Sequence, residues 1–206
     1  MTTFILDFET TGLNPYHHDI IDIGCKVLNE NISFNSLVKP KSKRLLDEYI
    51  SNLTGISNKM IVKEGIEYIT AYQNFINFII EHSKLNEPTY IVSHNGDSFD
   101  FIFFRKIIHE LVTKKYIGSN IIDSLQFKYI DTIPFAKRLL ENRYKFSLNS
   151  LCKTYNIEQP DAHRAYPDVI SLECLYNILC TIYEKQVNNS ITPELVYKYI
   201  HLLDYS

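Results

Sequence analysis

The chain has 206 residues, of which 45% are hydrophobic and 22% charged, so it can bury a substantial core and is not a wholly disordered protein. Its formal net charge of −3 at pH 7 excludes a protein that coats nucleic acid through general positive charge, because such binding needs many Lys and Arg contacts to phosphates. We find no secretory signal, no membrane span and no Cys-x-x-Cys pair among the four cysteines, and therefore expect an intracellular protein, cytoplasmic or nuclear and not secreted.

Hydrophobic periodicity predicts strands first and then strands alternating with helices. The predicted strands cover residues 3–8, 19–28, 32–38, 89–92 and 127–131. The predicted helices cover residues 45–52, 58–63, 71–83, 99–114, 133–140, 148–155, 169–185 and 193–203, with Ser147 as an N-cap. The turn-like residues 29–31 predict that the second and third strands form a hairpin. This order indicates a single α/β domain over residues 1–206, with a central five-stranded mixed sheet flanked by helices.

Asp7 and Glu9 lie at the end of the first predicted strand. Because one residue separates them, both side chains point to the same face of the strand. Two neighbouring carboxylates repel each other unless a cation lies between them, and Mg²⁺ or Mn²⁺ with oxygen ligands is the natural partner. An isolated Asp-x-Glu is more often a solvent-exposed strand end, so the metal hypothesis needs further acids.

Asp100 supplies a third acid at the start of a helix, after the fourth strand and a Gly-containing loop. A helix N-terminus favours an acid through its dipole alone, so Asp100 by itself is not diagnostic. The preceding His94, Asn95 and Gly96 favour a functional site, since Asn offers hydrogen bonds and Gly permits close backbone approach to a substrate. We interpret Asp97 as a turn or helix-cap residue.

His163 and Asp168 complete the set. Pro167 fits the first position of a helix, which places Asp168 in the first turn. An imidazole with an ordinary pKa of about 6.5 can take a proton from metal-bound water near neutral pH. A lone His is more often a surface or packing residue. Four carboxylates and an imidazole in this order, however, predict two cations that activate water against a phosphodiester and stabilise the leaving 3′ oxygen.

The three patterns resemble those of the DEDDh branch of the DnaQ-like 3′-to-5′ exonucleases, a family with an RNase H-like fold. The resemblance implies two Mg²⁺ ions, replaceable by Mn²⁺, held by the catalytic acids Asp7, Glu9, Asp100 and Asp168. It also implies that His163 is the general base. His163 stands five residues before Asp168, which is the spacing of this branch, whereas the sister branch has Tyr at the position of Arg164.

The resemblance further implies a set of substrate contacts, which are Thr10, Thr11, Gly12, Leu13, His94, Asn95 and Phe103. Leu13 stands where the family has an apolar wedge. Asp131-Thr132 resembles a family pair that we interpret as structural. The second and third motifs are similar to those of TREX-type repair exonucleases, although Thr10 and Pro167 depart from that pattern.

We therefore expect a stand-alone 3′-to-5′ exonuclease that releases nucleoside 5′-monophosphates from single-stranded or frayed ends, with DNA favoured over RNA, in repair or proofreading. The alternative within this class is an exoribonuclease that trims RNA ends. The alternative of another class is a catalytically silent nucleic-acid-binding module, although no ligand or base is missing from the sequence. Proofreading would need a polymerase partner in trans, and a homodimer is left open.

Overall fold

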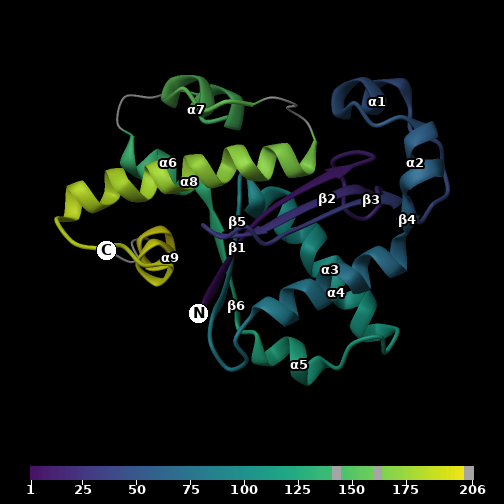
Figure 1. Cartoon of the computed structure of the whole chain (residues 1–206), viewed down its shortest axis with the longest axis horizontal. Coiled ribbons are helices and arrows are strands. Elements are labelled where there is room, and N and C mark those ends of the chain that lie inside the picture. Colours follow the sequence, from purple (N-terminus) through teal and green to yellow (C-terminus); the bar gives the residue numbers. More distant parts are fainter. Residues whose placement is uncertain (141–144, 160–163, 202–206) are drawn as a thin grey trace.

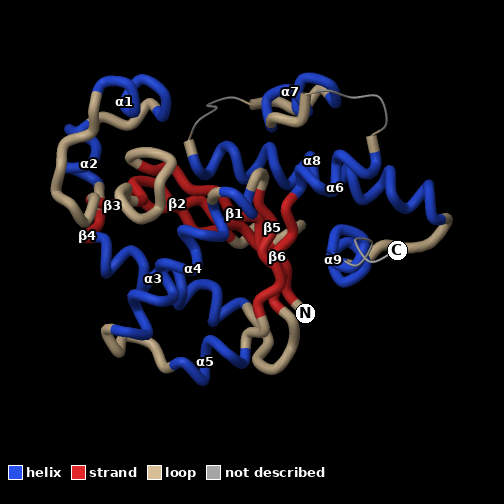
Figure 2. Tube along the Cα trace, turned by 180° about the vertical axis from the view of Figure 1, so that it is seen from behind, coloured by secondary structure: helices blue, strands red, loops and turns tan. Residues whose placement is uncertain are grey.

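The centre of the molecule is a twisted mixed sheet, and helices lie on both of its sides (Figure 1, Figure 2). The computed structural model describes residues 1–140, 145–159 and 164–201. In these residues the sheet has six strands in the order β4-β3-β2-β1-β5-β6. The strands are β1 Thr2–Thr10, β2 Ile20–Val27, β3 Ser33–Lys39, β4 Ile66–Glu67, β5 Thr89–Ser93 and β6 Phe127–Asp131.

The strand pairing confirms the mixed α/β sheet and corrects the number of strands. Strand β2 is antiparallel to both β1 and β3, which confirms the predicted hairpin. Strands β1, β5 and β6 are parallel neighbours. The expectation of five strands is wrong because β4 pairs with the end of β3, through Val38 with Ile66 and Lys39 with Glu67. Two residues are too few to show a strand's alternation, so this element had no signal in the sequence.

Among the described residues, the helices are α1 Glu48–Thr54, α2 Asn58–Glu64, α3 Tyr68–His82, α4 Asp100–Thr113, α5 Ser119–Ser124, α6 Thr132–Leu139, α7 Leu148–Tyr155, α8 Ala165–Val187 and α9 Pro193–His201, with a 3₁₀ turn η1 at Gly96–Ser98. Helix α5 was not expected. The Oγ of Ser147 accepts a hydrogen bond from the Ser150 amide at 3.3 Å, which confirms the predicted cap. No helix within these ranges is both long and apolar enough to cross a membrane.

Helix α8 begins earlier than expected, and this changes the position of one proline. The helix starts at Ala165 rather than 169, with Arg164 as its N-cap. Pro167 is therefore the third helical residue and not the first. The position tolerates Pro because the first-turn amides have no acceptor within the helix. Asp168 remains in the first turn, as expected.

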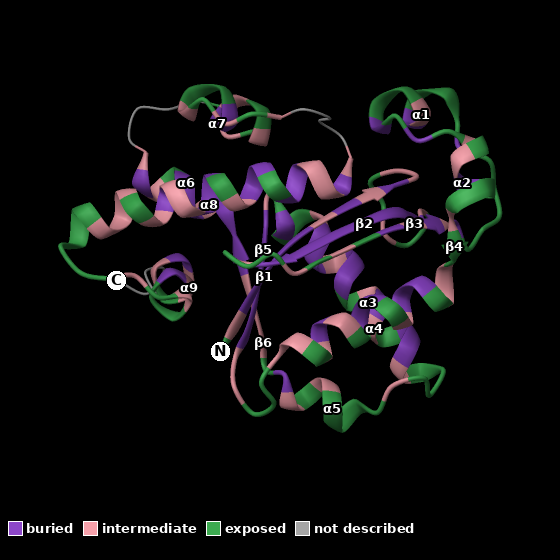
Figure 3. Ribbon diagram, in the orientation of Figure 1, coloured by how far each residue is buried: buried purple, intermediate pink, exposed green. Residues whose placement is uncertain are grey.

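Alternation along β1 divides the core into two layers. Phe4, Leu6 and Phe8 pack against α3 and α4, whereas Ile5 belongs to the cluster that includes α8. Figure 3 shows the sheet and the inward sides of the helices buried, with the exposed residues on the outer sides. Because side chains alternate, the odd-numbered residues that follow Ile5 on β1 face α8. Asp7 and Glu9 are those residues.

Candidate active site

The acids on β1 and α8 form one cluster. One carboxylate oxygen from each of Asp7, Glu9 and Asp168 lies within 4.8 Å of the others. The first two come from β1, and Asp168 comes from the first turn of the helix that covers this face. The structure thus brings together side chains that are more than 150 residues apart in the sequence. It does so on the face predicted by the Asp-x-Glu spacing.

The close approach of β2 to the start of α8 positions Asp168. At Gly24 an added Cβ would lie 2.5 Å from both the carbonyl carbon and the oxygen of Ala165, so only glycine lets the helix start sit on the strand. The buried Asp22 ties the same two elements together. Its Oδ2 accepts hydrogen bonds from Arg164 Nε at 3.0 Å and from the Ala165 amide at 3.4 Å.

Asp100 lies beside this cluster and is held rigidly. Its Oδ1 accepts from the Phe8 amide at 3.0 Å, and its Oδ2 accepts from Ser93 Oγ at 2.7 Å. The side chain is only 2% exposed, so these two donors replace the water that it loses on folding. Each carboxylate oxygen has a second lone pair, which remains available to a cation. Asp100 lines the same cleft as the three clustered acids.

Burial and mutual repulsion make the carboxylates of the site hard to ionise. Burial raises the pKa of Asp7 well above its ordinary value, and the charges of Asp100, Glu9 and Asp168 raise it further. Burial, with Asp168 and Asp22, raises the pKa of Glu9 to about 8, and burial raises that of Asp100 to about 7. Such a group of acids is either protonated or neutralised by bound cations. Oxygen ligands in this number can hold a divalent cation.

A cleft of about 250 Å³ opens above these acids. Its walls come from the loop after β5 and from the start of α7, and it is lined by Asp7, Phe8, Glu9, His94, Asn95, Phe99, Asp100, Ser147, Leu148, Asn149 and Asp168. The sequence had indicated Ser147 only as a helix cap and had given no reason to expect α7 at the site. Phe99 was also missed, because an aromatic residue beside a helix start is equally consistent with the core.

His94 is part of the wall, but both of its ring nitrogens are occupied. Nε2 lies 2.8 Å from the Phe146 carbonyl oxygen, and Nδ1 lies 2.8 Å from Thr132 Oγ1. Burial lowers the pKa of His94 to about 4, so the ring is neutral. A carbonyl can only accept, so Nε2 carries the proton and Nδ1 accepts from Thr132. These contacts fasten the start of α7 to the end of β5, which gives His94 a structural role in the wall of the cleft.

Asp131 organises the loop that leads to Asp100. Its Oδ1 accepts from the amides of Asn95 and Ile133, and its Oδ2 accepts from the amide of Asp97. One carboxylate therefore caps α6 and fixes the loop after β5, which confirms the structural interpretation of this residue. Gly96 packs against the ring of Phe101, where an added Cβ would lie 2.5 Å away. The close approach at Gly96 is thus to the core and not to a substrate.

The Thr10–Leu13 loop projects beside the acids. Thr10 Oγ1 donates to the Gly12 carbonyl at 2.8 Å, and Thr11 Oγ1 accepts from the Asp19 amide at 3.0 Å. Leu13 is 82% exposed, as an end-contacting side chain would need to be. Phe103, by contrast, is 1% exposed and packs on Phe99 with ring centroids 5.0 Å apart, so it has no surface to offer a substrate. His163 lies outside the described residues.

Comparison with known proteins gives independent information on this chain. Residues 4–172 match the model of a family described as Exonuclease. The DNA polymerase III PolC-type of Thermotoga petrophila is 34% identical over 171 residues, which cover 81% of this chain but only 11% of that protein. The DNA polymerase III subunit epsilon of Buchnera aphidicola is 27% identical over 205 residues, covering 91% of this chain and 77% of that protein.

Solved structures show the same fold. The crystal structure of Escherichia coli exonuclease I in complex with a dT13 oligonucleotide has a TM-score of 0.70 over 91% of this chain and 42% of that chain, at 20% identity. Cell-death related nuclease 4 has a TM-score of 0.63 over 91% of this chain and 64% of that chain, also at 20% identity. The expected fold class is confirmed by these likenesses.

Proposed function

The chain belongs to the Exonuclease family, whose model matches more than half of its length, and we propose that it is a metal-dependent 3′-to-5′ exonuclease acting on single-stranded or frayed DNA ends. Family membership confirms the DEDDh-type nuclease that the three acidic motifs resembled. The direction of attack and the release of nucleoside 5′-monophosphates belong to the proposal. The TREX-type subgroup does not appear among the relatives named above and stays a prediction.

The acid cluster is the observation that carries this proposal. Asp7, Glu9 and Asp168 converge at a cleft in which their negative charges are poorly solvated. Mg²⁺ binds oxygen ligands at about 2.0–2.1 Å, so oxygens on opposite sides of one ion are about 4.2 Å apart. The three carboxylate oxygens lie within 4.8 Å of one another, which is close to that distance. We assign these three residues and Asp100 as ligands for two Mg²⁺ ions, with Mn²⁺ able to substitute.

The chemistry divides between the metal ions and the protein. Bound divalent cations would lower the pKa of an attacking water and stabilise the leaving 3′ oxygen. The protein holds the acids in place through the Asp100 hydrogen bonds and the Arg164–Asp22 pair. We assign His163 as the general base, on its sequence position directly before Arg164. Thr10, Thr11, Gly12, Leu13 and Asn95 are proposed contacts to the terminal nucleotide.

DNA is favoured over RNA because the relatives include DNA polymerases and because exonuclease I was solved with a DNA oligonucleotide. The enzyme should be given matched DNA and RNA strands of the same base sequence. Faster hydrolysis of the DNA strand is expected, and faster hydrolysis of the RNA strand would assign the chain to RNA trimming instead.

The direct test uses single DNA strands labelled at either end. With Mg²⁺, a 3′ label should be released at once as a mononucleotide, whereas a 5′ label should remain on a ladder of shortening products. Chelation by EDTA or the substitution Asp7→Ala should stop both reactions. Asp123→Ala, which removes an exposed acid on α5, is the matched control and should retain full activity.

Two outcomes would overturn the proposal. Early release of the 5′ label would show that the enzyme attacks from the 5′ end. Binding of the strand without any hydrolysis, with Mg²⁺ or Mn²⁺ present, would favour the catalytically silent module.

A proofreading role in trans is the second candidate. The match to a polymerase III epsilon subunit over 77% of that protein favours it, because that relative is itself named as a polymerase subunit. Co-purification of the full chain with a polymerase from its own cells would support this role. Size-exclusion chromatography of the purified chain would show whether it also forms a homodimer.

A further inference from the structure

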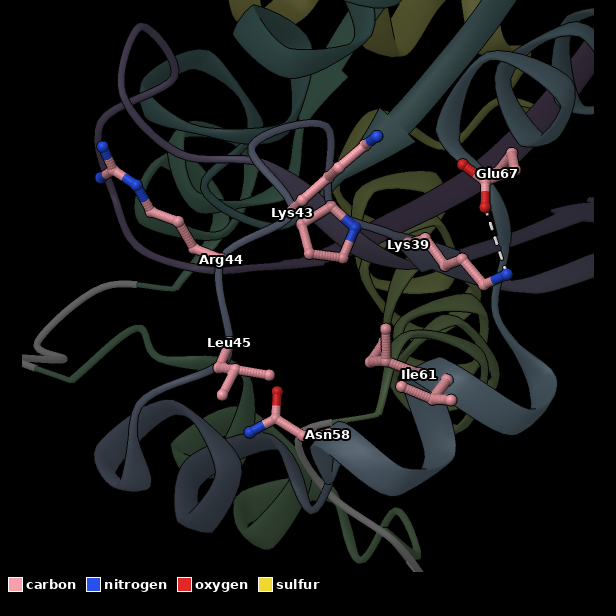
Figure 4. Close-up of a pocket in the computed structure, with 9 residues that line it drawn as sticks. Lys39, Lys43, Arg44, Leu45, Asn58, Ile61 and Glu67 are labelled. Carbon is pink, nitrogen blue, oxygen red and sulfur yellow. Dashed lines mark ion pairs between the residues drawn. The ribbon is translucent and has the colours of Figure 1, made fainter.

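A hollow lined in part by cationic side chains lies at the end of β3, outside the proposed active site. It has a volume of about 350 Å³ and lies between the loop after β3 and helix α2 (Figure 4). The hollow is lined by Lys39, Pro40, Lys43, Arg44, Leu45, Asn58, Ile61, Val62 and Glu67. We call this surface the β3–α2 groove.

The groove carries positive charge that the protein does not neutralise. Lys39 forms an ion pair with Glu67 at 3.1 Å. Lys43 and Arg44 are exposed, and neither side chain has an acidic partner in the part of the chain that the structure describes. Figure 4 shows Lys39 turned toward Glu67, whereas the side chains of Lys43 and Arg44 point away from each other on the neighbouring loop. Two free cations on a protein of net charge −3 favour an anionic ligand at this place.

Apolar side chains accompany these cations. Leu45 is 78% exposed and Val62 is 73% exposed on the two sides of the groove. Single-stranded nucleic acid has phosphates that bind protein cations and bases that pack against protein side chains. Cations next to exposed apolar side chains are therefore suited to such a ligand.

The groove is connected to the proposed active site through Asp19. The Oδ2 of Asp19 accepts from the Ser42 amide at 2.9 Å, which anchors the loop that carries Lys43 and Arg44. The Asp19 carbonyl accepts from the Thr11 amide at 2.9 Å, and its amide donates to Thr11 Oγ1 at 3.0 Å. Thr11 is two residues beyond Glu9, in the loop beside the acids. Asp19 therefore holds both this loop and the loop at the rim of the groove.

We propose that the β3–α2 groove binds the 5′-ward part of the same single DNA strand whose 3′ end enters the acid cleft. In this arrangement Lys43 and Arg44 bind phosphates of the strand, and Leu45 and Val62 offer apolar surface to the bases. This inference rests on the proposed exonuclease function. The groove, which lies outside the three acidic motifs, would then make the enzyme prefer long strands over short ones.

The experiment compares a long and a minimal substrate. The long one is oligodeoxythymidylate of about 20 nucleotides, which exceeds the roughly 4–16 nucleotides bound by known single-strand sites. The minimal one is the p-nitrophenyl ester of thymidine 5′-monophosphate, which can occupy only the acid cleft. The test variant is Lys43→Glu with Arg44→Glu. A control with the same change in charge is Lys84→Glu with Lys185→Glu, at two exposed positions away from the groove.

We expect the test variant to raise KM for the long strand at least tenfold while kcat/KM for the ester changes less than twofold. The control should behave as the parent. The slope of log affinity against log salt should fall in magnitude by about 1.4, since each phosphate contact to a single strand contributes about 0.7. The neutral variant Lys43→Asn with Arg44→Gln should also raise KM for the long strand, but by a smaller factor. Asn suits position 43 because the backbone there is left-handed, with φ of 55°.

The outcomes separate this inference from the proposed function. If the parent hydrolyses neither substrate, the exonuclease proposal fails. If the parent hydrolyses both but the test variant keeps the parental KM and salt slope for the long strand, the groove proposal alone fails. An equal loss of activity on both substrates, with an unchanged circular dichroism spectrum, would also overturn it, because the groove would then act on the acid cleft and not on the strand.

Discussion

Neutralising Glu9 tests the electrostatics of the acid cluster most directly. Burial and the neighbouring acids raise the pKa of Glu9 from 4.5 to about 8 in the folded protein. Between these two values the folded protein keeps a proton that the unfolded chain has released. The free energy of unfolding of the metal-free protein should therefore fall as pH rises through this window. Each pH unit corresponds to about 1.4 kcal/mol for one proton, so Glu9 accounts for at most about 5 kcal/mol.

The substitution Glu9→Gln removes the ionisation and keeps the shape of the side chain. In EDTA at pH 8, we expect the variant to be more stable than the parent by several kcal/mol. Near pH 5 the two proteins should have similar stability. Mg²⁺ should stabilise the parent by about 2.7 kcal/mol at one hundred times its dissociation constant, and the variant by less. Urea unfolding followed by circular dichroism between pH 5 and 8 measures these stabilities. Parent and variant are each unfolded once with EDTA and once with Mg²⁺.

Glu30→Gln serves as the control, because Glu30 is an exposed acid in the turn between β2 and β3. Its stability should follow that of the parent at every pH. The reasoning is refuted if the metal-free parent becomes more stable from pH 5 to pH 8. It is equally refuted if Glu9→Gln leaves the pH dependence unchanged.

Four further substitutions test the other assignments. Asp168→Asn should abolish detectable hydrolysis of a labelled strand while the urea midpoint in EDTA stays equal or rises, and a lower midpoint would indicate a structural role instead. His163→Ala should reduce kcat by two or more orders of magnitude with Mg²⁺ affinity retained, as expected for a general base, and a change of only a few-fold would remove that assignment. Leu13→Ala should raise KM for single strands several-fold with little change in kcat, and efficient cleavage of circular strands by the parent would show that the site does not select ends. Asp131→Ala leaves three amides without their acceptor, so the free energy of unfolding should fall by on the order of 3 kcal/mol, and an unchanged urea midpoint would contradict its role.

The sequence predicted those parts of the molecule that depend on short-range spacing. Asp7 and Glu9 share a face because strand side chains alternate. Asp168 lies in the first turn of α8 as expected, although the helix starts two residues before Pro167. The parts that were missed depend on contacts between distant segments. Strand β4 exists through its pairing with β3 alone, and the start of α7 reaches the cleft because His94 binds the carbonyl of Phe146, 52 residues away.

His94 and Phe103 illustrate the same limit. Both are residue types that bind nucleotides as readily as they pack inside proteins. Sequence position cannot distinguish the two roles, because they differ only in which neighbouring residues bond to the ring or pack on it. In the structure both Nδ1 and Nε2 of His94 are bonded, and Phe103 is covered by Phe99. Nothing in the local motif specifies the hydrogen bond to Thr132 or the packing of Phe99 on Phe103.

Strand β1 carries apolar side chains that stabilise the fold on one face and mutually repelling acids on the other. Phe8, between the two acids, is buried in the core beneath α3 and α4, and its amide donates to Asp100. The apolar face of the strand thus stabilises the fold, and this offsets the repulsion among the acids on the other face. An insertion of one residue before Asp7 would exchange the two faces and place the carboxylates in the core. The register of β1 is therefore constrained by folding and metal binding together.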